Sequence, residues 1–351
     1  MLRSTLRRSS LPAMLAVLSL VASSAKSALS DEAEKVVAAV KALGGQVRIF
    51  TLETGERVSF VELGDTRPSP ADLAQLEKLP AVEALDLSRT ELGDEAMPYI
   101  AKLKELRDLD LGQTFVSDKG LAQLAGLTKL RRLVLTGARI SGSGFAKLNK
   151  LEHLQELDLF GSQFSDVGMA CLPPFIELET LYLRGTRVTD AGLKHMVTLS
   201  KLRSLSLRGT DITDSGTTYL KQLKNLQWLG LKDTGITDTG LLELRGLTEM
   251  QWLGLKQTAI SDAGLMALVD MHKLASLDLE GTRVTDAGIP VLAGLSRLKM
   301  LNLSKTAVSD EGLRLLTGAH TLHWLDVHDT QVSGRGLIEL ERALPELDIV
   351  E

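Results

Sequence analysis

The sequence contains very little cysteine and few aromatic residues. Cys171 is the only cysteine among 351 residues, so no disulfide can form within the chain, and no base is evident beside it that would make it a nucleophile. Aromatic residues make up 4% of the sequence although hydrophobic residues make up 44%. Leucine therefore carries most of the apolar content, and this skew favours a repetitive architecture over a conventional enzyme core.

Motifs of the common enzyme classes are missing as well. The sequence has no Gly-x-Ser-x-Gly, no phosphate-binding loop and no His-Glu-x-x-His. The net charge of −5 does not favour a nucleic-acid partner. A histidine group near the C-terminus could suggest zinc, but its spacing matches no known ligand set: His320, His323 and His328, with Asp326 and Asp329. The sequence therefore predicts a non-enzymatic protein with no metal and no cofactor.

Residues 1–25 are typical of a secretory signal peptide. Arg3, Arg7 and Arg8 precede the apolar stretch LPAMLAVLSLVA at 11–22, which is short for a membrane span, and Ser-Ser-Ala follows as a cleavage site. We expect the mature chain to be exported to the periplasm, the cell envelope or the outside, without a membrane span. An uncleaved membrane anchor is the alternative interpretation.

A period of 24 residues runs through most of the chain. An apolar residue recurs twelve times at this interval from Val61 to Leu325, and a second apolar residue follows each of them two positions later. Such alternation is typical of a short strand with one buried face. Apolar residues three apart, as at Leu265, Leu268 and Met271, indicate a helix or 3-10 turn on the opposite side of each unit.

The pattern LxxLxLxxTxVTDxGLxxLxxL, which stands as LxxLYLRGTRVTDAGL at 178–193, resembles the leucine-rich-repeat family. Its Thr-Asp-x-Gly corner is most similar to secreted bacterial members. The resemblance implies an α/β solenoid of about twelve repeats over 61–348, with parallel strands on the concave face, short helices or 3-10 turns on the convex face, and a C-terminal cap at 342–351. Where the family usually has Asn or Cys after the strand, most repeats have a threonine, from Thr90 to Thr330, whose hydroxyl can also bond the backbone inside the turn.

Packing arguments lead to the same shape. One strand per unit cannot bury its own leucines, so neighbouring units must stack to form a continuous core. Strands stack about 4.8 Å apart, whereas helices need about 10 Å, so the stack bends with its strands on the inside. Residues 26–60 are expected to cap the N-terminal end with a helix over 31–45, capped by Asp31, and a hairpin with strands at 46–50 and 57–63.

The recurrent Ser/Thr-Asp-x-Gly corner predicts a helix start rather than a metal site. At Thr189 and Asp190 a hydroxyl and a carboxylate precede a helical apolar stripe, so the hydroxyl should accept a hydrogen bond from a free backbone N–H while the carboxylate favours the helix dipole. The glycine of the corner, such as Gly192, should allow close packing of successive coils. A calcium ladder is the alternative, but one carboxylate per coil supplies too few oxygens.

Functional residues are expected at strand positions that the leucines leave free, because these positions face the concave side. We call nine of them the concave patch: Phe160, Tyr182, Arg184, Arg208, Trp228, Lys232, Trp252, Lys256 and Trp324. All three tryptophans of the protein belong to this set, and Gly230 and Gly254 leave room beside two of the indoles. Acidic residues bracket the patch: Asp86, Asp110, Asp158, Asp278, Glu280, Asp326 and Asp329.

Aromatic and arginine side chains surrounded by charge are typical of protein-binding surfaces. The sequence therefore predicts an exported binding module whose concave patch recognises a protein partner. Two alternatives stay open at this point. Trp228, Trp252 and Tyr182 could stack on the sugar rings of a glycan or cell wall, or the chain could be a structural spacer without a ligand.

Overall fold

Each 24-residue unit folds into one coil, as the periodicity predicts. In the coil that begins with strand β7 (Thr180–Tyr182), the chain turns after Leu183 and enters the short helix α7 (Asp190–Leu193) on the opposite side. Leu181 and Leu183 are fully buried because they point between the strand and the helix. The predicted fold class, a leucine-rich-repeat solenoid with parallel strands and short helices or 3-10 turns, is confirmed.

The computed structural model describes residues 29–351, so the predicted signal peptide at 1–25 lies outside the described residues. The chain divides into two compact units. The first runs to Arg139 and includes Lys147–Leu154, and the second comprises Ile140–Ala146 and Gln155–Glu351. Within residues 29–351, no helix combines the length and the apolar character needed to cross a membrane.

The first unit begins with an antiparallel hairpin, followed by parallel strands that pair in sequence order. Its strands are β1 (Gln46–Thr51), β2 (Arg57–Glu62), β3 (Val82–Asp86), β4 (Asp108–Asp110) and β5 (Arg132–Val134). Its helices are α2 (Asp31–Ala42), α3 (Pro70–Gln75), η1 (Leu76–Lys78), η2 (Asp94–Ala96), α4 (Met97–Ile100), α5 (Asp118–Leu121) and η3 (Ala122–Gly126).

Helix α2 is capped by a different residue from the one expected. Ser30, not Asp31, is the N-cap, and its Oγ accepts a hydrogen bond from the Ala33 N–H at 3.2 Å. Asp31 lies in the first turn instead, where its negative charge still favours the helix dipole. The chain leaves the helix at Gly44, whose φ of +91° suits a residue without a side chain.

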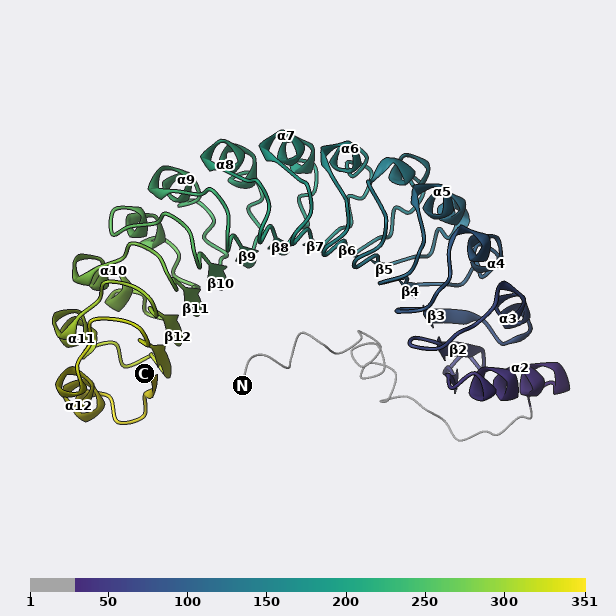
Figure 1. The fold of residues 1–351 in the computed structure, drawn as a ribbon, viewed down its shortest axis with the longest axis horizontal. Coiled ribbons are helices and arrows are strands. Elements are labelled where there is room, and N and C mark those ends of the chain that lie inside the picture. The colour runs from purple at the N-terminus through teal and green to yellow at the C-terminus, as the bar shows by residue number, and fades with distance from the viewer. Residues whose placement is uncertain (1–28) are drawn as a thin grey trace. The chain divides into compact units, whose positions relative to one another are not determined.

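The second unit contains parallel strands that also pair in sequence order and line the inner side of an arc, with helices on its outer side (Figure 1). The strands are β6 (Glu156–Asp158), β7, β8 (Ser204–Ser206), β9 (Trp228–Gly230), β10 (Trp252–Gly254), β11 (Ser276–Asp278), β12 (Met300–Asn302), β13 (Trp324–Asp326) and β14 (Asp348–Val350). The helical segments are α6 (Asp166–Met169), α7, η5 (Lys194–Met196), α8 (Asp214–Leu220), α9 (Asp238–Glu243), η6 (Gly264–Leu268), η7 (Asp286–Gly288), α10 (Ile289–Ala293), α11 (Asp310–Leu316) and α12 (Gly334–Ala343), and η4 (Ser143–Lys147) lies at the boundary.

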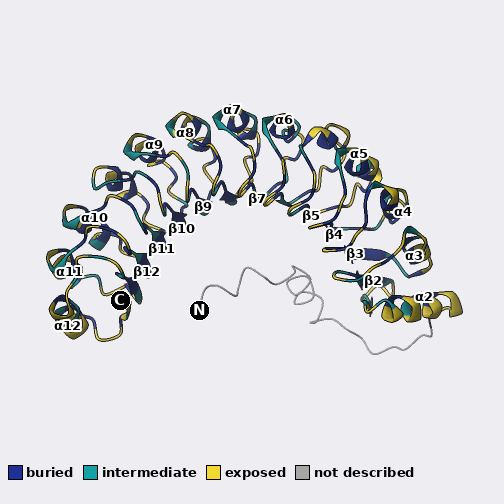
Figure 2. Cartoon of the chain, in the orientation of Figure 1, coloured by how far each residue is buried: buried dark blue, intermediate teal, exposed yellow. Residues whose placement is uncertain are grey.

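Strand β14 is an element that the repeat pattern does not predict. The pattern breaks at Pro345, yet Asp348–Val350 pairs parallel with β13 and continues the sheet by one strand. The buried residues of both units lie between the strands and the helices (Figure 2). Leucines supply most of this core, and Phe145, Phe164 and Phe175 add an aromatic cluster with ring centroids 5.5 and 6.2 Å apart.

The threonine that follows most of the strands bonds the turn internally, as predicted. The Thr186 hydroxyl donates to the Leu183 carbonyl at 2.6 Å, and Ser162, which replaces threonine in its coil, donates to the Leu159 carbonyl at 2.7 Å. The same carbonyl also accepts from the backbone N–H of that residue, at 3.2 Å for Thr186 and 3.1 Å for Ser162, so the hydroxyl adds a second hydrogen bond to the turn. The turn therefore keeps one shape from coil to coil.

The Ser/Thr-Asp-x-Gly corner starts the outer helix and also connects successive coils. The Thr189 Oγ1 accepts from the Ala191 N–H at 3.3 Å, which confirms its capping role. The carboxylate of Asp166 in the preceding coil accepts two hydrogen bonds, from the Thr189 N–H at 2.9 Å and the Thr189 hydroxyl at 2.7 Å. A Cβ at Gly192 would lie 2.3 Å from Asp166 Oδ1, so only a residue without a side chain leaves space for that carboxylate. The sequence did not predict that this aspartate links neighbouring coils.

Candidate functional site

Side chains on the inner face of the second unit form columns because neighbouring strands pair without a shift in register. Trp228 pairs with Ser204 on one side and Trp252 on the other, and Trp252 pairs with Ser276. Strands lie about 4.8 Å apart, so equivalent side chains of adjacent coils are in contact range. Residues 24 apart in the sequence therefore become direct neighbours.

Three aromatic side chains of the concave patch form one continuous group. The indoles of Trp228 and Trp252 are stacked, with ring centroids 4.2 Å apart and an interplanar angle of 6°. Tyr182 meets Trp228 edge to face at 6.5 Å. A Cβ at Gly254 would lie 2.4 Å from Trp252 Cη2 and one at Gly230 would lie 3.0 Å from Trp228 Cη2, so both indoles extend over the glycines as predicted.

A second group of the concave patch joins Phe160 to Arg184. The guanidinium carbon of Arg184 lies 4.7 Å from the centre of the Phe160 ring, within cation–π distance, and both side chains are exposed. The Asp158 carboxylate accepts from the Phe160 N–H at 2.9 Å and so holds the backbone of this coil. An exposed arginine on an aromatic ring presents an amphipathic surface to solvent.

Cations of the concave patch form a column whose charge is only partly compensated. Arg208 Nε and Lys232 Nζ share Asp233, at 3.7 and 3.8 Å. Lys256 forms an ion pair with Glu280. Burial and the neighbouring Arg208 and Lys256 lower the pKa of Lys232, which shows that cations outweigh anions around its amine.

The same excess of positive charge acts on Arg184. Burial lowers the pKa of Arg184, and the charge of Arg208 lowers it further. Glu280 is only 8% exposed and is shared by Lys256 and Lys305, the latter at 2.9 Å. Burial alone would raise its pKa, but hydrogen bonds from the two lysines outweigh burial and lower it. The carboxylates on the column are thus already engaged.

Trp324 does not join the other aromatic residues. It stands in the same column as Trp228 and Trp252, but on β13, and Ser276 and Met300 occupy the two intervening strands. At about 4.8 Å per strand, Trp324 lies roughly 14 Å from Trp252. Among residues 29–351, no aromatic contact joins Trp324 to the other indoles.

The C-terminal histidines are placed by neighbouring protein groups. His328 Nδ1 lies 2.5 Å from Asp326 Oδ1, and its Nε2 lies 3.8 Å from Asp329 Oδ2. His323 Nδ1 lies 2.6 Å from the Thr321 carbonyl. Within the described part of the chain, no three His, Cys, Asp or Glu side chains are grouped as metal ligands.

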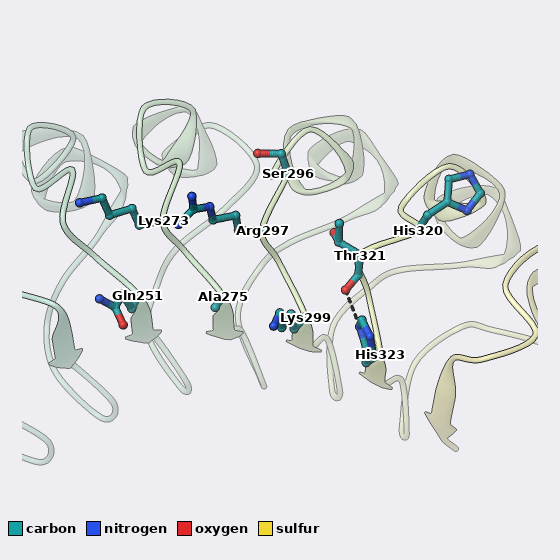
Figure 3. A pocket seen from close by; sticks show the side chains of 9 residues that line it. All are labelled: Gln251, Lys273, Ala275, Ser296, Arg297, Lys299, His320, Thr321 and His323. Carbon is teal, nitrogen blue, oxygen red and sulfur yellow. Dashed lines mark hydrogen bonds between the residues drawn. The ribbon is translucent and has the colours of Figure 1, made fainter.

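A groove on the flank of the second unit was not anticipated from the sequence. It has a volume of about 590 Å³ and lies at the N-terminal ends of the strands (Figure 3). Its lining residues are Gln251, Lys273, Ala275, Ser296, Arg297, Lys299, His320, Thr321 and His323. Because these positions precede the strands, they lie outside the columns from which the concave patch was chosen.

Comparisons with known proteins agree with the geometry. The family model described as Leucine Rich repeat matches residues 150–172 and 198–220. An internalin, inlF, from Listeria monocytogenes is similar with 22% identity and a TM-score of 0.63 over 92% of this chain and 94% of that one. A leucine-rich-repeat protein of Leptospira interrogans is similar with 21% identity and a TM-score of 0.62 over 83% and 71%. No curated protein sequence matches the chain significantly.

Structures of two protein complexes also contain similar chains. One is the plant peptide hormone receptor RGFR1 in complex with RGF2, with 16% identity and a TM-score of 0.53 over 86% of this chain and 59% of that one. The other is the mouse RP105/MD-1 complex, with 20% identity and a TM-score of 0.61 over 75% and 45%. At these identities the likeness concerns the fold.

Proposed function

The chain is a leucine-rich-repeat solenoid, and from this premise we propose that it is an exported, non-enzymatic module that binds a protein partner through the concave patch, with the members from Phe160 to Lys256 as the binding centre and Trp324 outside it. The observation that carries the proposal is the stacked pair Trp228 and Trp252 beside a column of cations whose carboxylates are already engaged. Aromatic and arginine side chains supply most of the binding energy in protein interfaces.

The aromatic group is preformed. Stacking fixes the two indoles relative to each other, and Tyr182 fixes Trp228 from the other side. Ordering a flexible side chain on binding costs roughly 0.5–1.5 kcal/mol, so a surface that is ordered beforehand avoids part of this cost. The parallel strands beneath add rigidity, because each is paired on both sides.

The charge of the column determines the kind of partner. Arg184, Arg208, Lys232 and Lys256 line successive coils, and the pKa of Lys232 is lowered first by burial and then by the charges of Arg208 and Lys256. A partner segment that brings carboxylates to this column would relieve the repulsion and gain charge-assisted hydrogen bonds. The partner is therefore proposed to present an acidic segment with at least one apolar group for the aromatic residues.

Two of the structural neighbours support a protein ligand over other ligands. The plant peptide hormone receptor RGFR1 is in complex with RGF2, and RP105 is in complex with MD-1. Export of this chain is proposed from the charge and hydropathy of residues 1–25. Cell fractionation tests export: recovery of the full-length, uncleaved chain in the cytoplasm would contradict it.

Glycan binding is the second candidate, and the stack itself argues against it. A sugar ring stacks on a free indole face, and the parallel planes of Trp228 and Trp252 each cover one face of the other, so only one face of each indole is left for a sugar. Tyr182 occupies a further edge of Trp228. A spacer without any ligand would leave the clustering of these aromatic residues unexplained.

The test is capture of a partner from the envelope fraction by the mature chain, followed by measurement of Kd with the purified partner. Replacing Trp228 and Trp252 by alanine should weaken binding at least a hundredfold. Trp324→Ala is the matched control, since that indole stands in the same column but apart from the group, and it should change Kd less than twofold. Unchanged binding by the double variant would disprove the site, and competition by soluble sugars would favour the glycan.

A further inference from the structure

The flank groove of the second unit is lined by basic side chains and by no carboxylate. Lys273, Arg297, Lys299, His320 and His323 come from three successive coils, at the place where the chain returns from the outer helices to the strands (Figure 3). The other lining residues are small or polar and uncharged. The groove therefore offers a local excess of positive charge on a protein whose net charge is −5.

Arg297 breaks a regular pairing of charges along this flank. Residues 24 apart form ion pairs in earlier coils, with Lys201 Nζ 2.6 Å from Glu177 and Lys273 Nζ 2.6 Å from Glu249. Arg297 is the next residue in this column, and its neighbours are Lys273, which already has its acid, and Thr321. No carboxylate is left in the column for Arg297.

Lys299 shows the same break in the adjacent column. Arg203 Nε lies 3.7 Å from Glu179 in an earlier coil, but the residues beside Lys299 are Ala275 and His323. In residues 29–351, neither Arg297 nor Lys299 has a carboxylate within ion-pair distance. Two cations on one coil, separated by a single residue, are thus left without internal anions.

Uncharged donors complete the lining. The Thr321 carbonyl lies 2.6 Å from His323 Nδ1, and since a carbonyl only accepts, that nitrogen donates; Nε2 is then an acceptor in the neutral ring and donates to an anion only when the ring is protonated. The Ser296 hydroxyl and the Gln251 amide lie in the same groove. Arginine binds phosphate and sulfate through two parallel N–H donors, and lysine binds them as a point charge.

We propose that this groove binds a linear polyanion that carries phosphate or sulfate groups at successive positions. The open groove runs across several coils, so it suits an extended chain with repeated anionic groups rather than one enclosed ion. Arg297 and Lys299 bind the central group, with His323 and Lys273 on either side along the coils. The site is separate from the concave patch and does not depend on the partner proposed there.

The test is calorimetric titration of the mature chain with tripolyphosphate, a sulfated oligosaccharide and inorganic phosphate at one ionic strength, and titration with tripolyphosphate again over a salt series. Both linear polyanions should bind at least tenfold more tightly than inorganic phosphate. The double variant Arg297→Gln and Lys299→Gln should weaken tripolyphosphate binding at least tenfold and reduce the slope of log Kd against log salt, because fewer counterions are released. Trp228→Ala with Trp252→Ala should have no effect, which separates this site from the concave patch.

The double variant Arg187→Gln and Arg283→Gln is the matched control, since it removes two exposed cations of the same unit outside the groove. It should leave tripolyphosphate binding within twofold of the natural chain. Equal losses in the control and the double variant would show general charge attraction and overturn the proposal. Binding to vesicles of anionic lipid without binding to tripolyphosphate would also overturn it and assign the groove to lipid headgroups.

Discussion

Asp190 of one coil accepts two hydrogen bonds from Thr213 of the next. Its Oδ1 accepts from the Thr213 N–H at 2.9 Å, and its Oδ2 accepts from the Thr213 hydroxyl at 2.5 Å. Equivalent pairs recur along the second unit, as between Asp214 and Thr237. The stack of coils is thus tied by side chains on the outer side as well as by strand pairing on the inner side.

Removing the Asp190 carboxylate should destabilise the stack. Asp190→Ala leaves the Thr213 N–H and hydroxyl without their acceptor, and hydrogen bonds to charged groups contribute roughly 1.5–3 kcal/mol each in favourable cases. Because the site is partly exposed, we expect a loss of about 1–3 kcal/mol in the free energy of unfolding, measured by urea denaturation. Asp211→Asn, at an exposed position of the next coil, is the control and should change stability by less than about 0.5 kcal/mol.

Gly216 and Asp190 should be energetically coupled. A Cβ at Gly216 would lie 2.4 Å from Asp190 Oδ1 and 2.9 Å from Leu193 Cδ1, so Gly216→Ala should be destabilising. Once Asp190 is alanine, the closest clash is gone, so the double variant should be more stable than the sum of the single effects implies. Strict additivity in a double-mutant cycle would show that the carboxylate is not what requires the glycine.

Gly254→Ala should disrupt the indole stack without unfolding the chain. The new methyl group would lie 2.4 Å from Trp252 Cη2, so the indole must move away from its place beside Trp228. The expected result is loss of the coupled tryptophan signal in near-ultraviolet circular dichroism, with an unchanged far-ultraviolet spectrum. Ser206→Ala, at the equivalent position of β8, should keep the signal, and a retained signal in Gly254→Ala would contradict the geometry.

The cationic column should make partner binding sensitive to salt. Arg208→Gln and Lys232→Gln remove two charges beside the indoles, so we expect at least tenfold weaker binding at low salt. Most of this difference should disappear at 1 M salt, because salt at that concentration screens charges over a few ångströms. Surface plasmon resonance over a salt series measures this. The double variant Arg187→Gln and Arg283→Gln, which removes two exposed cations outside the concave patch, controls for net charge. A flat salt dependence for the natural chain would rule out an acidic partner segment.

Asp110 should make the stability of the first unit depend on pH. Burial raises the pKa of Asp110 to about 6, against an ordinary value of 3.8, and the neighbouring Asp86 adds to the effect, while a hydrogen bond from Gly112 opposes it. The folded state therefore holds the proton more tightly than the unfolded state, so this residue favours folding below pH 4 and loses that contribution as the pH rises through 6. Asp110→Asn should show no such loss.

Comparing the Asp110→Asn variant with the natural chain isolates the contribution of Asp110 to stability. The variant should be the more stable chain at high pH. The difference in the free energy of unfolding should grow from near zero at pH 4 to on the order of 1–3 kcal/mol at pH 7.5. Chemical denaturation at a series of pH values measures it. A difference that stays constant with pH would show that the carboxyl titrates alike in both states.

Much of the fold could be predicted because it depends on local periodicity. The 24-residue spacing places Leu181 and Leu183 inward and Tyr182 and Arg184 outward, since side chains alternate along a strand whatever surrounds it. The capping role of Thr189 and the small size of Gly192 follow from the residue types in the same way. The cap at Ser30 was missed because Ser and Asp both suit a helix start, and the backbone geometry decides between them.

By itself, the sequence determined the coil, its buried leucines and the columns in which Trp228, Trp252 and Trp324 stand. Only the tertiary structure decided which members of a column touch: two indoles stack, while Trp324 stays apart behind Ser276 and Met300. The same holds for the Asp190–Thr213 link and for the unpaired Arg297. Periodicity fixes the direction in which a side chain points, but contact depends on rotamers and on distances between coils, which exist only once the coils are stacked.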